Sequence, residues 1–486
     1  IGFNSLYSNP TADGNTAVGY QAGYSNTTGS DNTLIGLQAG LATTTGVAVT
    51  AVGSRAGIAN TTGQITAVGY AALEDNTTAS RNTAVGVASL RNNTTGAANT
   101  AVGDSSLFTN TTADGNTAVG FEAAYSNTTG TNNVALGRAA LYDNSTGDQN
   151  TALGRSALEN NTTADNNTAV GKDAMYANTT GTANVGLGKD ALASNTTGVE
   201  STAVGYQAGF LNTTGRITAM GRHALRSNTT AVENTGIGYR ALRDNTTGAS
   251  NTALGGDALL SNTTASNSTV IGYQAAYSNV TGGNLTAIGY QALYNNTAAN
   301  NLAIGYQAGY ANTSGTENAF MGLGAAQSNT TGNYNTAIGG RYALALNTTG
   351  SSNTAVGYSA LYSNTTASQN TAVGAQTLTN NTTGAQNVAL GFYSLRYNTT
   401  ANNNTAVGYQ SLYVNTTGAN NTAVGMNALV VNTTGTNLTA IGAFAGDANT
   451  TGNYNTAVGT YALTTNAAGN WNTATGREAL SNSTGN

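Results

Sequence analysis

One 17-residue pattern, written most plainly as NTAVGYQAGYSNTTGSD from Asn15 to Asp31, fills this chain from end to end. With the Asn of NTAVG as position 1, the pattern starts 28 times; most starts are 17 residues apart, a few are 16 apart, and one is 18 apart near Gly340–Tyr342. Such regularity predicts a solenoid or an array. No shift in composition divides the chain, so we expect one continuous array over residues 1–486 with no internal domain boundary.

The length of the repeat selects the kind of solenoid. A repeat built from a helical hairpin needs more than about thirty residues. This unit is also poor in helix formers and rich in Gly, Asn, Thr and Val. Seventeen residues suit two short strands and two turns, so the sequence predicts an all-β, parallel β-solenoid (a β-roll) of about 28 coils, one repeat per coil. At a spacing of about 4.8 Å the coils would make a rod of roughly 135 Å.

Two apolar rows are candidates for the core. Position 4 is aliphatic, as at Val18 and Ile35, and position 9 is mostly Leu, as at Leu73 and Leu90. Positions 3 and 8 are nearly always small. We therefore expect a thin interior in which the position-4 and position-9 side chains are buried throughout, with Ala between them. Charged residues avoid both rows, and we expect them, Glu74 included, on the solvated outside.

Two further rows point to backbone requirements. Position 5 is Gly in every repeat, which predicts either a positive φ or a neighbouring backbone too close for a Cβ. Position 12 is Asn in nearly every repeat, where Asn favours a turn and stacked amides can hydrogen-bond from coil to coil. The structural rows begin with Gly19, Gly36, Gly53, Asn26, Asn60 and Asn76.

Many position-12 asparagines also begin N-x-T sequons, which would be glycan acceptors in a host that glycosylates them. Examples are Asn26, Asn60, Asn127, Asn212 and Asn364. A structural row requires Asn and Thr at the same places, and we favour that interpretation.

Tyrosine recurs at positions 6 and 10. Exposed aromatic rows could stack on sugars or seal a subunit interface. They could equally reflect strand propensity and ring-on-ring stacking along the solenoid, and the sequence leaves both interpretations open. The candidate contact residues are Tyr20, Tyr24, Tyr206, Tyr290, Tyr294, Tyr306, Tyr310, Tyr409 and Tyr413.

Composition argues against most partners and most chemistry. Charged residues make up 7% and the net charge is −5, so the chain has no basic patch for nucleic acid. No apolar run approaches the roughly 18 residues of a membrane span. Cysteine is absent and His223 is the single histidine, so we expect neither a metal nor a cofactor, and a surface role for His223.

Catalytic patterns are also missing. A glycosidase-like solenoid needs a pair of carboxylates in one groove. The acids, such as Glu122, Asp173, Glu200 and Asp257, are scattered over different coils. We therefore expect no enzymatic activity. Threonine rows at positions 2, 13 and 14 could match an ice lattice, but the pair at 13 and 14 is adjacent and lies in a turn, which disfavours that function.

The NTAVG-x-x-A core, as in Ala17-Val18-Gly19 with Ala22, resembles the YadA-like head repeats of trimeric autotransporter adhesins and similar shaft repeats of phage tail fibres. The resemblance covers the whole chain. It implies a left-handed β-roll, three chains about one axis and an adhesive surface. The 17-residue unit is longer than the usual repeat of the adhesins, which bears on the cross-section and on the trimer.

These observations predict a non-enzymatic extracellular fibre, at a cell surface or a virion surface, that presents a repetitive surface to cells or glycans. The thin core favours a homo-oligomer, with a parallel trimer preferred. A purely structural filament or phage tail-fibre shaft is the main alternative, and a glycan hydrolase or an ice-binding protein is less favoured. Neither end carries a distinct cap, so we expect a segment of a longer chain.

Overall fold

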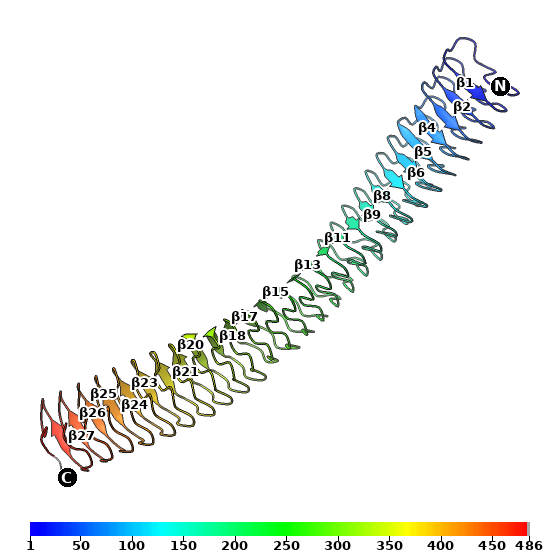
Figure 1. The fold of residues 1–486 in the computed structure, drawn as a ribbon. Coiled ribbons are helices and arrows are strands. Elements are labelled where there is room, and N and C mark those ends of the chain that lie inside the picture. The colour runs from blue at the N-terminus through cyan, green and yellow to red at the C-terminus, as the bar shows by residue number, and fades with distance from the viewer. Residues whose placement is uncertain (484–486) are drawn as a thin grey trace. The chain divides into compact units, whose positions relative to one another are not determined.

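The computed structural model describes residues 1–483 and confirms the predicted fold class, an all-β parallel β-solenoid of about 27 coils with about 17 residues per coil (Figure 1). No helix occurs in these residues. The chain divides into two compact units, Ile1–Thr247 and Gly248–Asn486, called unit 1 and unit 2 below.

Each strand contains positions 2 to 4 of one repeat, in a few cases with one or more further residues. The strands of unit 1 are β1 (Thr16–Val18), β2 (Thr33–Ile35), β3 (Thr50–Val52), β4 (Ile65–Val68), β5 (Asn82–Val85), β6 (Thr100–Val102), β7 (Thr117–Val119), β8 (Val134–Leu136), β9 (Thr151–Leu153), β10 (Thr168–Val170), β11 (Val185–Leu187), β12 (Thr202–Val204), β13 (Ile217–Met220) and β14 (Asn234–Ile237). The strands of unit 2 are β15 (Thr252–Leu254), β16 (Thr269–Ile271), β17 (Thr286–Ile288), β18 (Leu302–Ile304), β19 (Ala319–Leu323), β20 (Thr336–Arg341), β21 (Thr354–Val356), β22 (Thr371–Val373), β23 (Val388–Leu390), β24 (Thr405–Val407), β25 (Thr422–Val424), β26 (Thr439–Ile441), β27 (Thr456–Val458) and β28 (Thr473–Thr475).

Within each unit, every strand pairs in parallel with the next strand along the chain. In unit 1 the paired residues are equivalent positions of successive coils, as Ala84 pairs with Ala101. Unit 2 follows the same rule. The one longer repeat shifts the register between Met321 and Leu323, where β19 pairs with β20. The extra residue is therefore absorbed as a bulge, and the pairing of β20 with β21 is regular again.

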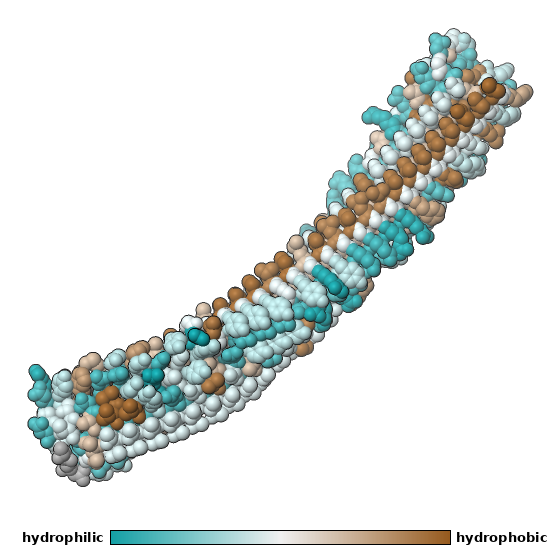
Figure 2. Space-filling view, in the orientation of Figure 1, coloured by the Kyte–Doolittle hydropathy of each residue, from teal (hydrophilic) through white to brown (hydrophobic). Residues whose placement is uncertain are grey.

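The position-4 row lies outside, and the expectation that it is buried is wrong. Position 3 is buried in every strand, and Val18, Leu136 and Leu254 at position 4 keep 40%, 46% and 43% of their surface exposed. Successive side chains of a strand point to opposite faces, so positions 2 and 4 share the outer face once position 3 turns inward. Figure 2 shows the result in unit 1, where a continuous hydrophobic row follows strands β1–β13.

The interior contains Ala at positions 3 and 8 and Leu at position 9. The predicted burial of the position-9 row is confirmed at Leu73 and Leu90, which are fully inaccessible to solvent, but it fails in the last coil, where Leu480 is 46% exposed. At Leu34, a large residue at position 3, the position-9 residues of its own coil and of the preceding coil are glycine. Leu34 packs where a Cβ on Gly23 or Gly40 would lie 2.6 or 2.7 Å from its methyl groups. A large side chain from one coil thus fills the space that a glycine leaves in the neighbouring coil, an exchange of volume between coils that close packing requires.

The position-9 leucines adopt a backbone conformation that the sequence did not reveal. Leu73 and Leu90 have φ values of 49° and 50°, in the left-handed region that branched side chains rarely enter. Such residues cost about 1–2 kcal/mol each. The neighbouring coil offsets this cost, because the Leu73 N–H donates to the Ser89 carbonyl at 3.0 Å and the side chain is buried.

Both reasons foreseen for the glycine row hold. At position 5, Gly19, Gly36 and Gly53 have φ values of 136°, 136° and 138°. At Gly205, with φ of 133°, a Cβ would lie 2.7 Å from the carbonyl carbon and oxygen of Gly221 in the next coil. A side chain at this position would therefore separate two coils.

The position-12 asparagines form long runs of amide hydrogen bonds from coil to coil, called the asparagine ladder below. Asn76 Nδ2 donates to Asn60 Oδ1 at 2.9 Å, and the same bond recurs in unit 1 up to Asn245 at 2.8–3.3 Å. The ladder is interrupted at Thr43. Asn26, in the coil before Thr43, is buried. Because threonine offers no amide there, Asn26 Oδ1 has no hydrogen-bond partner among the described residues.

A second row of asparagines at position 1 connects strands to turns and was not foreseen. Asn82 Oδ1 accepts from the Asn99 N–H at 2.8 Å, and Asn82 Nδ2 donates to the Gly96 carbonyl at 2.8 Å. These residues are buried. The side-chain amides of this row therefore provide hydrogen-bond partners for buried backbone N–H and carbonyl groups at the ends of the strands and in the turns.

Candidate functional site

The tyrosine rows are densest in unit 2. Position 6 is the more exposed row, with Tyr290 and Tyr306 at 43% and 51% exposure, whereas Tyr294 and Tyr310 at position 10 are half-buried. Both rows leave the coil after the position-5 glycine, on the segment that follows each strand. The sequence therefore identified a real surface feature, two neighbouring aromatic rows on coils that carry β16, β17 and β18.

The rings of these rows stack on each other. The centroids of Tyr290 and Tyr306 are 5.2 Å apart with the planes at 7°, and those of Tyr294 and Tyr310 are 5.2 Å apart at 11°. Ring faces inside the stack are covered by their neighbours, so ring edges and hydroxyl groups are what remains for a partner. Burial raises the pKa of the Tyr294 hydroxyl, which therefore stays a neutral donor at physiological pH.

A row of glutamines lies between the two tyrosine rows, and sequence reasoning missed it. Gln291 Nε2 donates to Gln274 Oε1 at 2.9 Å, and Gln307 Nε2 donates to Gln291 Oε1 at 2.9 Å. The signal was the repeated Tyr-Gln pair at positions 6 and 7. Tyrosine hydroxyls and glutamine amides together give this face a regular set of polar groups.

The remaining candidate tyrosines do not gather into one site. Tyr20 and Tyr24 stack on Phe3 and Tyr7 at 5.9 and 5.1 Å in the first coils of unit 1. Tyr206 contacts His223 at 5.3 Å, with Lys189 and Arg222 also over its ring. Tyr409 stacks on Phe392 at 6.0 Å, and Tyr413 meets Tyr397 edge-on at 5.1 Å. Each takes part in a local aromatic contact.

Unit 1 holds a groove of about 760 Å³ that crosses six successive coils. Carboxylates line it together with arginines and aromatic rings, and small side chains such as Ala139 and Ser194 leave room for it. Glu122 and Asp173, expected to be scattered, both line this groove. The expectation that no groove gathers acids is therefore wrong, because positions 7 and 10 of successive coils project to the same face. Glu200 lies elsewhere in unit 1, and Asp257 is buried in unit 2.

Charged side chains are mostly outside, with Glu74 as an exception. Glu74 is 3% exposed and is held between Arg55 and Arg91, with 2.6 Å from Arg91 Nε to its Oε2. A buried carboxylate is tolerated when it is paired in this way. The ion pairs of Arg216 are at the surface.

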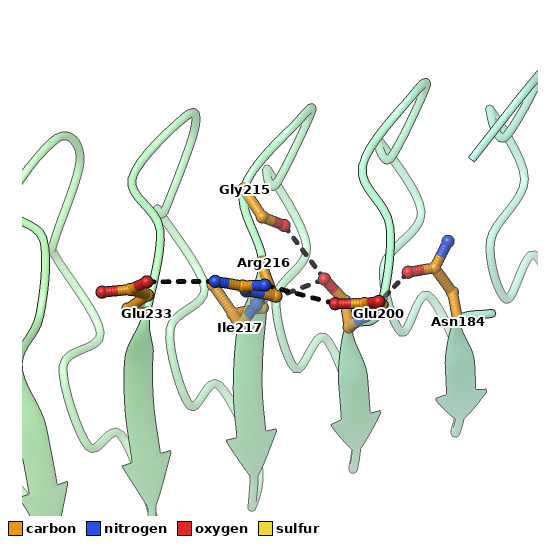
Figure 3. A network of polar contacts seen from close by, with 7 residues as sticks. Asn184, Glu200, Gly215, Arg216, Ile217 and Glu233 are labelled. Carbon is orange, nitrogen blue, oxygen red and sulfur yellow. Dashed lines mark hydrogen bonds and ion pairs between the residues drawn. The ribbon is translucent and has the colours of Figure 1, made fainter. Parts of the chain in front are cut away.

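One surface network spans three coils (Figure 3). Arg216 Nη1 lies 3.2 Å from Glu200 Oε2, and Arg216 Nη2 lies 3.0 Å from Glu233 Oε1. Hydrogen bonds to the two carboxylates raise the pKa of Arg216. All three side chains are at least half exposed, so the network adds little to stability.

The five candidate glycosylation sites are not accessible in the folded chain. Each of these asparagines has 0% exposure. At Asn127, Nδ2 donates both to Asn110 Oδ1 at 3.0 Å and to the Gly130 carbonyl at 2.9 Å. A glycan on Nδ2 would remove these bonds and would need space inside the coil, so the sequons serve the ladder.

The described residues contain no group of three or more His, Cys, Asp or Glu side chains placed to hold a metal ion. Over residues 1–483 we find no helix with the length and hydrophobicity needed to cross a bilayer. No protein-family model matches the chain, and no curated protein matches its sequence. Function must therefore be argued from the surfaces themselves.

Proposed function

We propose that the chain is a non-enzymatic extracellular fibre that attaches to cells or glycans at a cell surface or virion surface through a repeated face. The observation that carries this proposal is the regular outer face of unit 2, where tyrosine and glutamine rows present the same polar groups on successive coils. One coil offers few contacts and no enclosing pocket. Many coils acting together raise the effective concentration at their neighbours, which suits a repetitive target.

Self-association is the second part of this proposal, with a parallel trimer preferred. A folded chain rarely leaves a continuous apolar row in water. In unit 1, the residue that ends each strand contributes to this row, and none of these residues is buried. At about 50 Å² each they give roughly 700 Å², close to what one partner buries in a standard interface. The row therefore supports packing against further copies of the chain.

The attachment test uses variants from which successive whole coils are removed, assayed on cell layers and glycan arrays. Binding should strengthen with coil number and depend weakly on salt, because the face is nearly uncharged. A second variant replaces Tyr290, Tyr294, Tyr306 and Tyr310 by Phe, which keeps the ring stacks but removes the hydroxyls. A matched control replaces four exposed position-14 threonines of unit 2 by Ser. If binding changes neither with coil number nor in the Phe variant, the purely structural filament or tail-fibre shaft would be favoured.

The association test replaces Val102 and Val170 by Asp on the apolar row, and Thr95 and Thr163 by Asp on the exposed turn as the control. Light scattering at micromolar concentration should show a trimer for the parent chain and the control. The valine variant should dissociate, since each charge would be desolvated in the interface. A monodisperse parent monomer would reject self-association.

A further inference from the structure

The position-10 row of unit 1 is interrupted within the groove. Upstream of it, Phe108, Tyr125 and Tyr142 form a closed stack with centroids 5.1 and 5.2 Å apart and planes at 4° and 8°. The next coils carry Glu159 and then Tyr176 at the same position. The regular stack therefore stops at Tyr142, and its terminal ring faces a coil without an aromatic residue.

The alternation continues for two more coils, with Ala193 and then Phe210. Tyr176 is 40% exposed, and it contacts no other ring and no cation among the described residues. Phe210 has the Arg226 guanidinium over its ring, 5.4 Å from the centroid. Because Arg226 belongs to the coil after Phe210, the side of Phe210 toward Ala193 remains available. Aromatic faces that are covered in unit 2 are thus open in this groove.

The spacing of the open rings sets the thickness of what fits between them. Tyr142 and Tyr176 are two coils apart, as are Tyr176 and Phe210, which gives about 9.6 Å at the usual strand separation. A ligand in van der Waals contact with both ring faces takes up about 7–8 Å of this separation in the two contact distances alone. A flat aromatic ligand would leave a gap, whereas a puckered pyranose ring with its axial hydrogens is thick enough to touch both faces. The interval between Tyr176 and Phe210, where only Ala193 intervenes, is therefore shaped for a sugar ring, and the interval between Tyr142 and Tyr176 adds the Glu159 carboxylate beside it.

The polar lining suits hydroxyl groups. Four carboxylates and two guanidinium groups line the groove. Asp173 is near Lys172 at 3.2 Å, but Glu122 and Glu159 have no ion-pair partner among the described residues and can accept from hydroxyls. Burial raises the pKa of the Tyr142 hydroxyl, and the Glu122 carboxylate raises it further. The surplus of carboxylates disfavours an acidic polysaccharide.

We infer that this groove binds a neutral linear oligosaccharide, with sugar rings between the aromatic side chains and hydroxyls on Glu122, Glu159 and Arg138. The inference rests on the proposed attachment function and gives it a ligand class. It differs from the repeated face of unit 2 in being a single site. In this groove the ring faces contact the ligand, whereas in unit 2 only the edges and hydroxyl groups of the stacked tyrosines are available for contact.

The test measures calorimetric binding to the whole chain of neutral hexasaccharides of β-linked glucose, α-linked glucose and β-linked N-acetylglucosamine, with hexalysine as a cationic probe. The informative variants are Glu159→Tyr and Ala193→Tyr, which complete the aromatic row and close the intervals. Stacked tyrosines occur at this position elsewhere, so both variants should fold. The matched control is Val430→Tyr, the same change at position 10 in unit 2.

At least one hexasaccharide should bind the parent chain and Val430→Tyr equally, and each groove variant should weaken that binding at least about tenfold. Circular dichroism should show the variants folded. Three results would overturn the inference: no hexasaccharide binds, hexalysine alone binds, or both groove variants bind like the parent. Cell attachment that still rises with coil number in that case would leave the proposed function standing, so the two failures are distinguishable.

Discussion

Replacing one amide of the asparagine ladder by a carboxylate should make the stability of the solenoid depend on pH. Asn178 is fully buried, and its Nδ2 donates to Asn161 Oδ1 at 2.8 Å and to the Gly181 carbonyl at 3.0 Å. Its Oδ1 accepts from Asn195 Nδ2 at 2.9 Å. Asn178→Asp keeps the shape but, once ionised, places a second acceptor oxygen against two acceptors.

The size of the effect follows from these bonds. Asn161 Oδ1 and the Gly181 carbonyl each lose the hydrogen bond from Asn178 Nδ2, and a buried acceptor left unpaired costs about 1–3 kcal/mol of folding free energy. Burial without a cation raises the pKa of a carboxyl by up to about 3–5 units, and each unit is 1.36 kcal/mol. Because pH 7 lies about 3 units above the unfolded pKa, we expect a loss of about 4 kcal/mol at pH 7. Because the folded pKa is raised above the unfolded value of about 3.9, the loss is smallest below that pH and grows as pH rises toward the folded pKa.

Hydrogen exchange measured by mass spectrometry resolves this locally, which a long repeat array requires because it need not unfold in one step. Peptides covering β10–β12 should open more easily in Asn178→Asp as pH rises from 4 to 8, after correction for intrinsic exchange. Peptides from β22–β24 serve as the internal reference. Asn166→Asp, at an exposed site with φ of 61°, is the matched control. Equal protection of the two variants at pH 7 would refute the reasoning.

Three further predictions concern single positions. Thr43→Asn should stabilise unit 1 by about 1–3 kcal/mol, because its amide would supply the donor that Asn26 Oδ1 lacks, and a thermal melt that stays unchanged would count against the ladder. Gly205→Ala should cost about 2–5 kcal/mol, measured by denaturant unfolding, since its Cβ would meet Gly221 at 2.7 Å. Burial lowers the pKa of His223 and Arg222 lowers it further, so stability should fall as pH drops below about 6.5, and His223→Gln should flatten that dependence in melting curves.

The sequence predicted the coil, the parallel class and the rows of glycine, leucine and asparagine, because a strict period forces equivalent residues to stack. It failed at position 4. A three-residue strand can bury either its middle residue or its two ends, and hydrophobicity alone favours the aliphatic residue at position 4 over the alanine at position 3. In the structure position 3 turns inward instead, and Ala51 at that position is fully inaccessible to solvent.

The groove of unit 1 could not be predicted for a related reason. Its side chains come from different positions of six coils, and each alone looks like an ordinary surface substitution. Only the stacked coils show that Ala193 lies between two rings and that Glu122 and Asp173 share one face. The aromatic rows of unit 2 were visible in the sequence, but whether the ring faces were open was not.

The exchange of volume between coils limits how such a chain can grow by duplication. Phe320 occupies the interior only because the preceding coil has Gly309, where a Cβ would lie 2.7 Å from the ring. A copy of the coil 318–334 inserted after itself would set the second ring beneath Ala326 instead of a glycine. Successful copying at this place must include the coil before it. The heritable module for the Phe320 coil is therefore a pair of coils, because its copy is tolerated only together with the Gly309 coil.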